Sequence, residues 1–192
     1  MEINMKKIMA LILAAVMVFS MTACGGEKTY SLDDLAVRDK ESGKLIRIGD
    51  KREKVEKITG EPERTEDEAD GEVRCSYTSG ATSLDITYNE DGEIIEIIGF
   101  WDKFMEAEKN YELAKGVELG QTKEDFLNAF PEADTVPGEQ SSLTVRKRED
   151  SKKYKLYTEV LDDPEATDTI LLTAFYYDLK IDSFGISTYK SE

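Results

Sequence analysis

The longest uninterrupted apolar run in the chain lies near its amino terminus, from Ile8 to Phe19. Two lysines precede this run, and the small residues Thr22 and Ala23 lead into Cys24. An apolar run of about a dozen residues is too short to span a bilayer as a helix, which needs about 20. The pattern is typical of an export leader. It predicts a removable signal peptide over residues 1–23.

Beyond the leader, a short helical segment is followed by segments with the alternation of β-strands. Asp50 and Glu53 form the pattern of a capping box, and Gly60 marks the end of the predicted helix. The strand-like runs that follow are 73–78, 81–89 and 93–101. Because no helix separates these runs, they favour an antiparallel sheet over a parallel one.

The second half of the chain repeats this order of elements. Residues 117–126 lie over residues 46–55, with Gly120 on Gly49 and Phe126 on Val55. The strand-like runs of this half are 142–148, 154–161, 169–178 and 180–188. A period of this length indicates two copies of a supersecondary unit. We therefore predict an α+β fold, in which two tandem copies of a short helical unit pack on an antiparallel β-sheet.

The predicted organisation divides the chain into four parts. They are the signal peptide 1–23, the lipidated Cys24 with a tether over 24–42, a first α+β repeat over 43–103, and a second over 104–192. Residues 102–115, between the halves, fit either a helix or an irregular crossover, and the pattern leaves both open.

Two predicted strands, 93–101 and 169–178, are apolar on both faces, although a sheet with one solvated face should alternate. One explanation is that these strands lie centrally or at the junction of the two repeats. The other is an exposed apolar patch for a protein partner, with a polar rim. The residues of this patch would be Ile94, Ile98, Phe100, Leu171, Phe175 and Tyr177, with Arg146 and Arg148 at the rim.

Composition removes several classes of function. The formal net charge is −16, and it becomes −17 when the leader with its two lysines and one glutamate is lost, which argues against nucleic-acid binding. The chain has no histidine, so catalysis by Ser-His-Asp or Cys-His and histidine-ligated zinc are excluded. We predict no cofactor, no metal and no catalytic residues.

The two cysteines and the acidic runs have simple interpretations. If Cys24 is acylated, Cys75 has no partner for an intramolecular disulfide, and its alternation with Val73 and Tyr77 predicts a buried strand position. The acidic run 66–72 lacks the alternating ligands of a calcium loop, and Asp162–Glu165 resembles a turn. Both are interpreted as solvated loops.

The residues Met21-Thr22-Ala23-Cys24 resemble the lipobox of bacterial lipoproteins. This resemblance implies that the Cys24 sulfur receives a diacylglyceryl group and that Cys24 becomes the amino terminus. Two acyl chains are enough for stable anchoring. The protein is therefore expected on a membrane surface outside the cytoplasm.

The two helix starts, at Gly49 and Gly120, resemble the SmpA/OmlA group of small lipoproteins, to which BamE belongs. In tandem they also resemble the β-lactamase-inhibitory-protein fold. These resemblances imply short helices packed on antiparallel sheets.

We therefore predict a non-catalytic, lipid-anchored module that binds a protein of the cell envelope. An inhibitor of an envelope enzyme such as a β-lactamase is the alternative, on fold resemblance alone. A carboxylate-dependent hydrolase is a third hypothesis, since such sites need only two acids held close together.

Overall fold

A computed structural model describes residues 29–105, 107–136, 140–148, 151, 153–156 and 166–190. The predicted signal peptide, Cys24 and the turn at Asp162–Glu165 lie outside the described residues. Residues 29–42, predicted to be part of a tether, include the strands β1 and β2, and Tyr30, Leu35 and Val37 are buried there. The division into domains stays a prediction.

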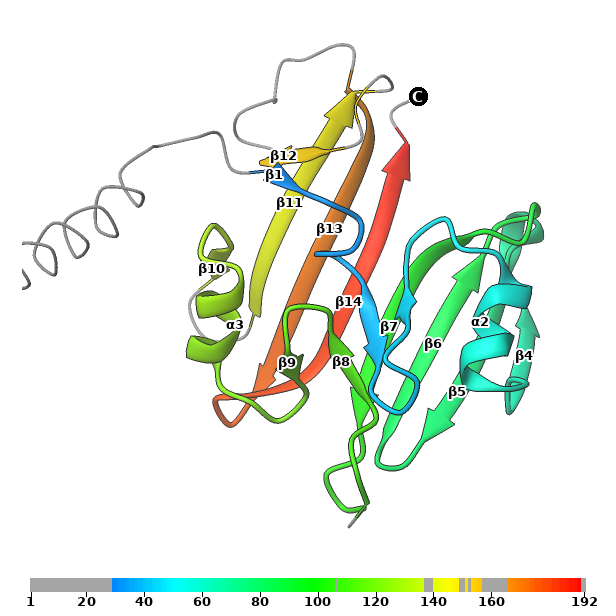
Figure 1. Cartoon of the computed structure of the whole chain (residues 1–192), viewed down its shortest axis with the longest axis horizontal. Coiled ribbons are helices and arrows are strands. Elements are labelled where there is room, and N and C mark those ends of the chain that lie inside the picture. The colour runs from blue at the N-terminus through cyan, green and yellow to red at the C-terminus, as the bar shows by residue number, and fades with distance from the viewer. Residues whose placement is uncertain are drawn as a thin grey trace, which may run out of the picture.

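Most of the described chain forms two antiparallel sheets (Figure 1). The large sheet contains β1 (Thr29–Tyr30), β4 (Arg64–Asp67), β5 (Val73–Ser79), β6 (Thr82–Tyr88), β7 (Ile94–Trp101), β10 (Asp134–Val136), β11 (Gln140–Arg148), β12 (Tyr154–Leu156), β13 (Ala166–Tyr177) and β14 (Lys180–Lys190). The small sheet contains β2 (Val37–Asp39), β3 (Leu45–Ile46), β8 (Tyr111–Leu113) and β9 (Val117–Glu118). The strands predicted in both halves therefore form with shifted ends, except that residues 157–161 of the predicted strand 154–161 lie outside the described residues.

The predicted α+β fold with two helical units is wrong, because the described chain is mostly β-sheet. Its two α-helices, α2 (Arg52–Thr59) and α3 (Lys123–Ala129), have only about two turns each. The strands of both halves join in one sheet of order β1-β12-β11-β13-β14-β7-β6-β5-β4, in which β14 pairs with β7. The strands of the two halves thus form one continuous sheet, because β14 pairs with β7 where the edges of two separate sheets would lie.

The two helix starts are nevertheless held to the sheet in the same way. The Gly49 amide donates to the Ile94 carbonyl, and the Gly120 amide donates to the Ile181 carbonyl. Both glycines have positive φ, of 81° and 83°, which the missing Cβ permits. The two halves resemble each other at these helix starts, and this local similarity explains why the sequence suggested a repeat.

Capping of the two helices differs from the prediction. The N-cap of α2 is Lys51, without a side-chain hydrogen bond, so the predicted capping box of Asp50 is wrong. The Asp50 carboxylate instead accepts from the Arg47 amide, 2.9 Å away. A capping box is present at α3, between Thr122 and Asp125.

The region between the halves is an irregular crossover that leads into β8, and the helix considered for residues 102–115 does not form in its described part. The Tyr111 side chain of β8 is buried. No helix among the described residues is long and apolar enough to cross a membrane.

The hydrophobic core lies on one face of the large sheet, where the small sheet and α2 cover it (Figure 1). Its fully buried side chains include Val37, Ile46, Val55, Cys75, Leu84, Ile86, Ile97, Phe126, Leu172, Phe184 and Ile186. The predicted burial of Cys75 is confirmed. Alternate residues of the same strands point to the opposite face, which is called the outer face below.

Phe184 is the core side chain that joins the two halves of the large sheet. It lies on β14 opposite Gly99 of β7, and its ring occupies the space where a Cβ at position 99 would be. We expect Phe184→Ala to lower the free energy of unfolding by about 3–5 kcal/mol, because the truncation leaves a cavity at this junction. Urea denaturation should show one transition for the whole chain, while the outward Ser183→Ala should change little. Two separate transitions, or a loss below about 1 kcal/mol, would contradict a shared core.

A buried pair of tyrosines predicts how stability depends on pH. The hydroxyl groups of Tyr77 and Tyr88 lie 3.0 Å apart, and both side chains are buried. Burial raises the pKa of Tyr77 to about 12, from an ordinary value of 10.0. Burial raises the pKa of Tyr88 as well, and the hydrogen bond between the two hydroxyl groups adds to the effect.

A group whose pKa is higher in the folded state contributes stability that is complete below its unfolded pKa and is lost as the pH rises through its folded pKa. The free energy of unfolding should therefore be flat as the pH approaches 10.0 and fall between pH 10.0 and about 12. Chemical denaturation at a series of pH values measures this. The double variant Tyr77→Phe and Tyr88→Phe removes both phenols and should lose less stability over that range. An equal loss in both proteins would show that the pair is not responsible.

Candidate partner-binding surface

The outer face holds five of the residues predicted for the patch, with Tyr177 at the hairpin and the other four on paired rows of the sheet. In one row of the sheet, Phe100 of β7 and Phe175 of β13 flank Ser183 of β14. Two strand spacings separate the Cα atoms of the two phenylalanines by roughly 10 Å. In the next rows, Ile98 pairs with Gly185, and Leu171 pairs with Ser187.

The outward residues of β14 are small, and this leaves the apolar side chains of its two neighbours uncovered between them. Ser183, Gly185 and Ser187 occupy the outward positions. A Cβ built at Gly185 would meet nothing within 4 Å, so the space above β14 is open there. The side chains of β7 and β13 therefore line an accessible strip along β14.

Ile94, also predicted for this patch, lies in the core. A β-bulge in β7 is the reason, because Tyr88 pairs with Ile94 while Thr87 pairs with Glu96, so that Ile95 is an extra residue. The extra residue reverses the alternation, and the Ile94 side chain is 1% exposed.

The two predicted rim residues lie on β11, away from Phe175. Arg146 pairs with Thr169, and its Nε donates to the Thr169 hydroxyl over 2.9 Å. Six residues of extended β13 separate Thr169 from Phe175, or roughly 20 Å. The backbone of Arg148 pairs with Ala166, and its side chain lies outside the described residues.

The large hydrophobic side chains that are most exposed in the described chain gather at one end of the large sheet. We call these six residues the apolar tip: Phe100 (40% exposed), Phe104 (87%), Met105 (51%), Phe175 (43%), Tyr177 (64%) and Leu179 (78%). They come from the end of β7, the loop that follows it, and the hairpin between β13 and β14. Single exposed hydrophobic residues are common, but a contiguous group marks an interaction site.

A pocket of about 430 Å³ lies between the loop after β7 and the hairpin between β13 and β14. Its lining consists of Trp101, Lys103, Phe104, Tyr177, Asp178, Lys180, Ile181 and Asp182. The Lys103 ammonium lies 3.9 Å from the centre of the Tyr177 ring and 5.7 Å from that of Phe104, as in cation–π contacts. Four of the lining residues are aromatic or aliphatic and four are charged. The aromatic residues suit contact with an apolar side chain of a partner.

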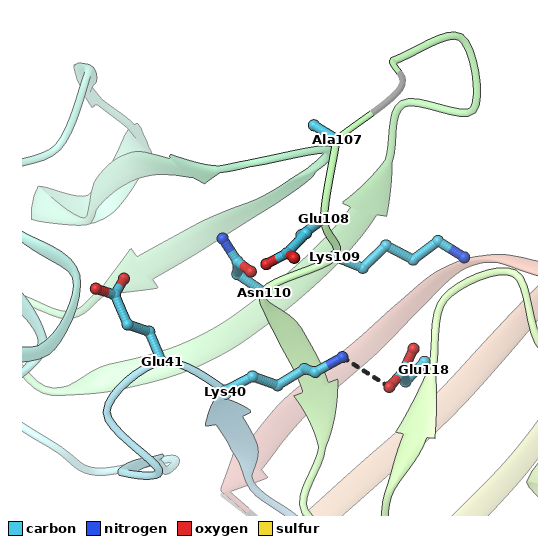
Figure 2. Close-up of a pocket in the computed structure, with 7 residues that line it drawn as sticks. All are labelled: Lys40, Glu41, Ala107, Glu108, Lys109, Asn110 and Glu118. Carbon is cyan, nitrogen blue, oxygen red and sulfur yellow. Dashed lines mark hydrogen bonds and ion pairs between the residues drawn. The ribbon is translucent and has the colours of Figure 1, made fainter.

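A second pocket, of about 790 Å³, is polar and is lined by Lys40, Glu41, Ala107, Glu108, Lys109, Asn110 and Glu118 (Figure 2). Lys40 points across it to Glu118, with an Nζ to Oε1 distance of 2.8 Å. The Lys109 ammonium donates to the Leu119 carbonyl over 2.7 Å and lies 3.9 Å from the centre of the Trp101 ring. Burial lowers the pKa of Lys109. Both lysines are thus held by the protein, and Lys109 fixes the tryptophan that lines the pocket of the apolar tip.

The acidic run 66–72 contributes to β4 and to the short 3-10 helix η1 (Ala69–Gly71). Arg74 is paired with Glu68, at 3.3 Å, and Arg64 with Glu66. In the described part of the chain, no three acidic or cysteine side chains gather as a metal ion would need. The run therefore places charged side chains on β4, the edge strand of the large sheet. Charged side chains on an edge strand discourage pairing with a strand of another molecule.

No protein-family model matches the chain, and no curated protein matches it. Among solved structures, an extracellular protein containing an SCP domain from Bacillus anthracis is similar over 73% of this chain and 43% of its own, with 12% identity and a TM-score of 0.41. A cysteine-rich secretory protein from Staphylococcus aureus is similar over 73% and 44%, with 14% identity and a TM-score of 0.41. The chain spans less than half the length of either protein.

These comparisons correct the family resemblance given above. The resemblance to the SmpA/OmlA group with BamE, and to tandem β-lactamase-inhibitory-protein repeats, is wrong. No family model supports it, and the strands of both halves join in one large sheet instead of two helix-on-sheet repeats. Because both TM-scores are below 0.5, these structures assign no function to the chain.

Half of the apolar tip was not among the predicted patch residues. Phe104, Met105 and Leu179 lie in a loop and a turn, where strand alternation gives no information. The available indication was their composition, since turns seldom contain large apolar residues.

Proposed function

We propose that this protein is a lipid-anchored, non-catalytic module that binds a protein of the bacterial cell envelope. The observation that carries the proposal is the apolar tip, in which six large hydrophobic side chains are exposed on three adjoining segments. Interface cores are enriched in Phe, Tyr and Met, which supports a protein as the occupant.

The anchor is proposed from the sequence around Cys24. The apolar run ends in small residues directly before this cysteine, and β1 begins at Thr29, shortly after it. A folded body attached so closely to an acylated cysteine would stay at the membrane surface, outside the cytoplasm. The description of the Bacillus anthracis protein as extracellular agrees with this location.

The two other hypotheses have less support. An inhibitor of a β-lactamase was suggested by a fold resemblance that is wrong, and no feature of the described surface favours it. A carboxylate-dependent hydrolase needs two acids in a pocket that changes their protonation. In the polar pocket of Figure 2, Glu118 is instead neutralised by Lys40.

The test uses the full-length protein with a carboxyl-terminal affinity tag. It is expressed in bacterial cells and purified from their envelope after detergent solubilisation. We expect one protein to be retained in stoichiometric amount. The retention should depend on Phe175 and Tyr177. Recovery of background proteins only, at the level of an untagged control, would contradict the proposed function.

A further inference from the structure

The hairpin between β13 and β14 has a leucine, Leu179, at a turn position that favours glycine. Tyr177 pairs with Lys180, so the turn consists of Asp178 and Leu179 alone. Both have positive φ, of 51° and 64°. Two-residue turns of this kind strongly prefer Asn-Gly or Asp-Gly. Asp178 fits this preference, whereas Leu179 occupies the position where glycine is preferred and a leucine side chain is strained.

Leu179 is unfavourable at this position for a second reason, its exposure. Its side chain is 78% exposed, so burial does not offset the cost of the backbone conformation. The positive φ and the exposed side chain are thus two reasons why folding alone would favour glycine at position 179. Backbone strain that the fold does not need is concentrated at functional sites.

The position of Leu179 suits contact with a partner. It projects from the hairpin that supplies Tyr177, Asp178, Lys180 and Asp182 to the pocket of the apolar tip. β1, the first described strand after Cys24, lies near the other end of the large sheet (Figure 1). A chain anchored through Cys24 can thus present this hairpin away from its attachment point.

We propose that Leu179 is the side chain that enters an apolar socket on the protein partner, and that this socket has a basic rim. The inference rests on the proposed function. At the hairpin, Asp178 and Asp182 lie beside Lys103 and Lys180, so the charges balance locally. The whole chain has a net charge of −16, and a cationic rim on the partner complements that charge. The same charge disfavours a second copy of this chain and a surface of anionic lipid.

The test compares Leu179→Gly with Leu179→Met in the full-length, tagged protein. Glycine relieves the backbone strain and removes the side chain, so the thermal midpoint should rise by about 2 °C. The amount of protein retained from a detergent-solubilised envelope extract should fall at least tenfold. Methionine keeps an apolar side chain, and the Leu179→Met variant should retain its partner nearly as well as the original protein. Opposite changes in stability and retention would not arise from a purely structural residue.

Each other outcome overturns the inference in a recognisable way. Unchanged retention by Leu179→Gly, with loss in Phe175→Ala plus Tyr177→Ala, rejects the role of Leu179 and leaves the proposed function standing. Unchanged retention by both variants rejects the proposed function as well. Flotation with anionic phospholipid vesicles that needs Leu179, for the protein without its acyl anchor, would identify a membrane contact. Sedimentation as a dimer that needs Leu179 would identify a second copy as the occupant.

Discussion

The double variant Phe175→Ala plus Tyr177→Ala is expected to abolish retention of the partner while its thermal midpoint stays nearly unchanged. Both side chains are on the outer face and about half of their surface is open to solvent, so their removal leaves little cavity in the core. Aromatic residues near the centre of an interface contribute most of its binding energy. We therefore expect retention in the envelope extract to fall at least a hundredfold, which corresponds to about 3 kcal/mol.

Ser76→Ala plus Thr78→Ala is the matched control for this variant. Both residues are outward on β5, at the other side of the same face, and Thr78 is exposed. The control should retain the partner fully. A large drop of the thermal midpoint in the aromatic variant would show instead that Phe175 and Tyr177 belong to the core.

The variant Cys24→Ala is expected to lose membrane attachment completely. Without the thiol no diacylglyceryl group can be added, and the described chain contains no apolar helix that could replace the anchor. The two acyl chains are the whole of the proposed attachment, because a body with a net charge of −17 is repelled by anionic lipid. Metabolic labelling with a radioactive fatty acid and fractionation of the cells measure both effects.

Cys75→Ala is the matched cysteine control. Cys75 is buried among core residues of β5, so this variant should keep both the label and the membrane attachment while losing about 1 kcal/mol of stability. Labelling of Cys24→Ala at the original level, or its recovery in the membrane fraction, would contradict the proposed anchor.

Sequence alternation predicted most strands of the large sheet because each has one buried face. It placed Ile98, Phe100, Leu171 and Phe175 on one side, where the pairings of β7, β13 and β14 hold them. It failed at Ile94, since one extra residue in β7 reverses the side that every earlier position faces. A bulge of this kind depends on the pairing of two strands, and one strand alone does not indicate it.

The fold class could not be predicted for a different reason. The pairing of β14 with β7 joins residues 183–187 to residues 96–100, which lie far apart in the sequence. Local patterns carry no information on such a pairing, so two capped segments appeared to be two units. The small sheet was missed because its strands have only two or three residues each, too few to show alternation.

Photo-crosslinking in living cells tests the central claim most directly, the claim that the apolar tip binds an envelope protein. A photoreactive phenylalanine analogue is placed at Phe175 of the full-length protein, or at the exposed Lys57 of α2 as the control on the covered side of the large sheet. We expect an adduct with one protein from position 175 and none from position 57. No protein adduct from position 175, or the same adduct from both positions, would contradict it.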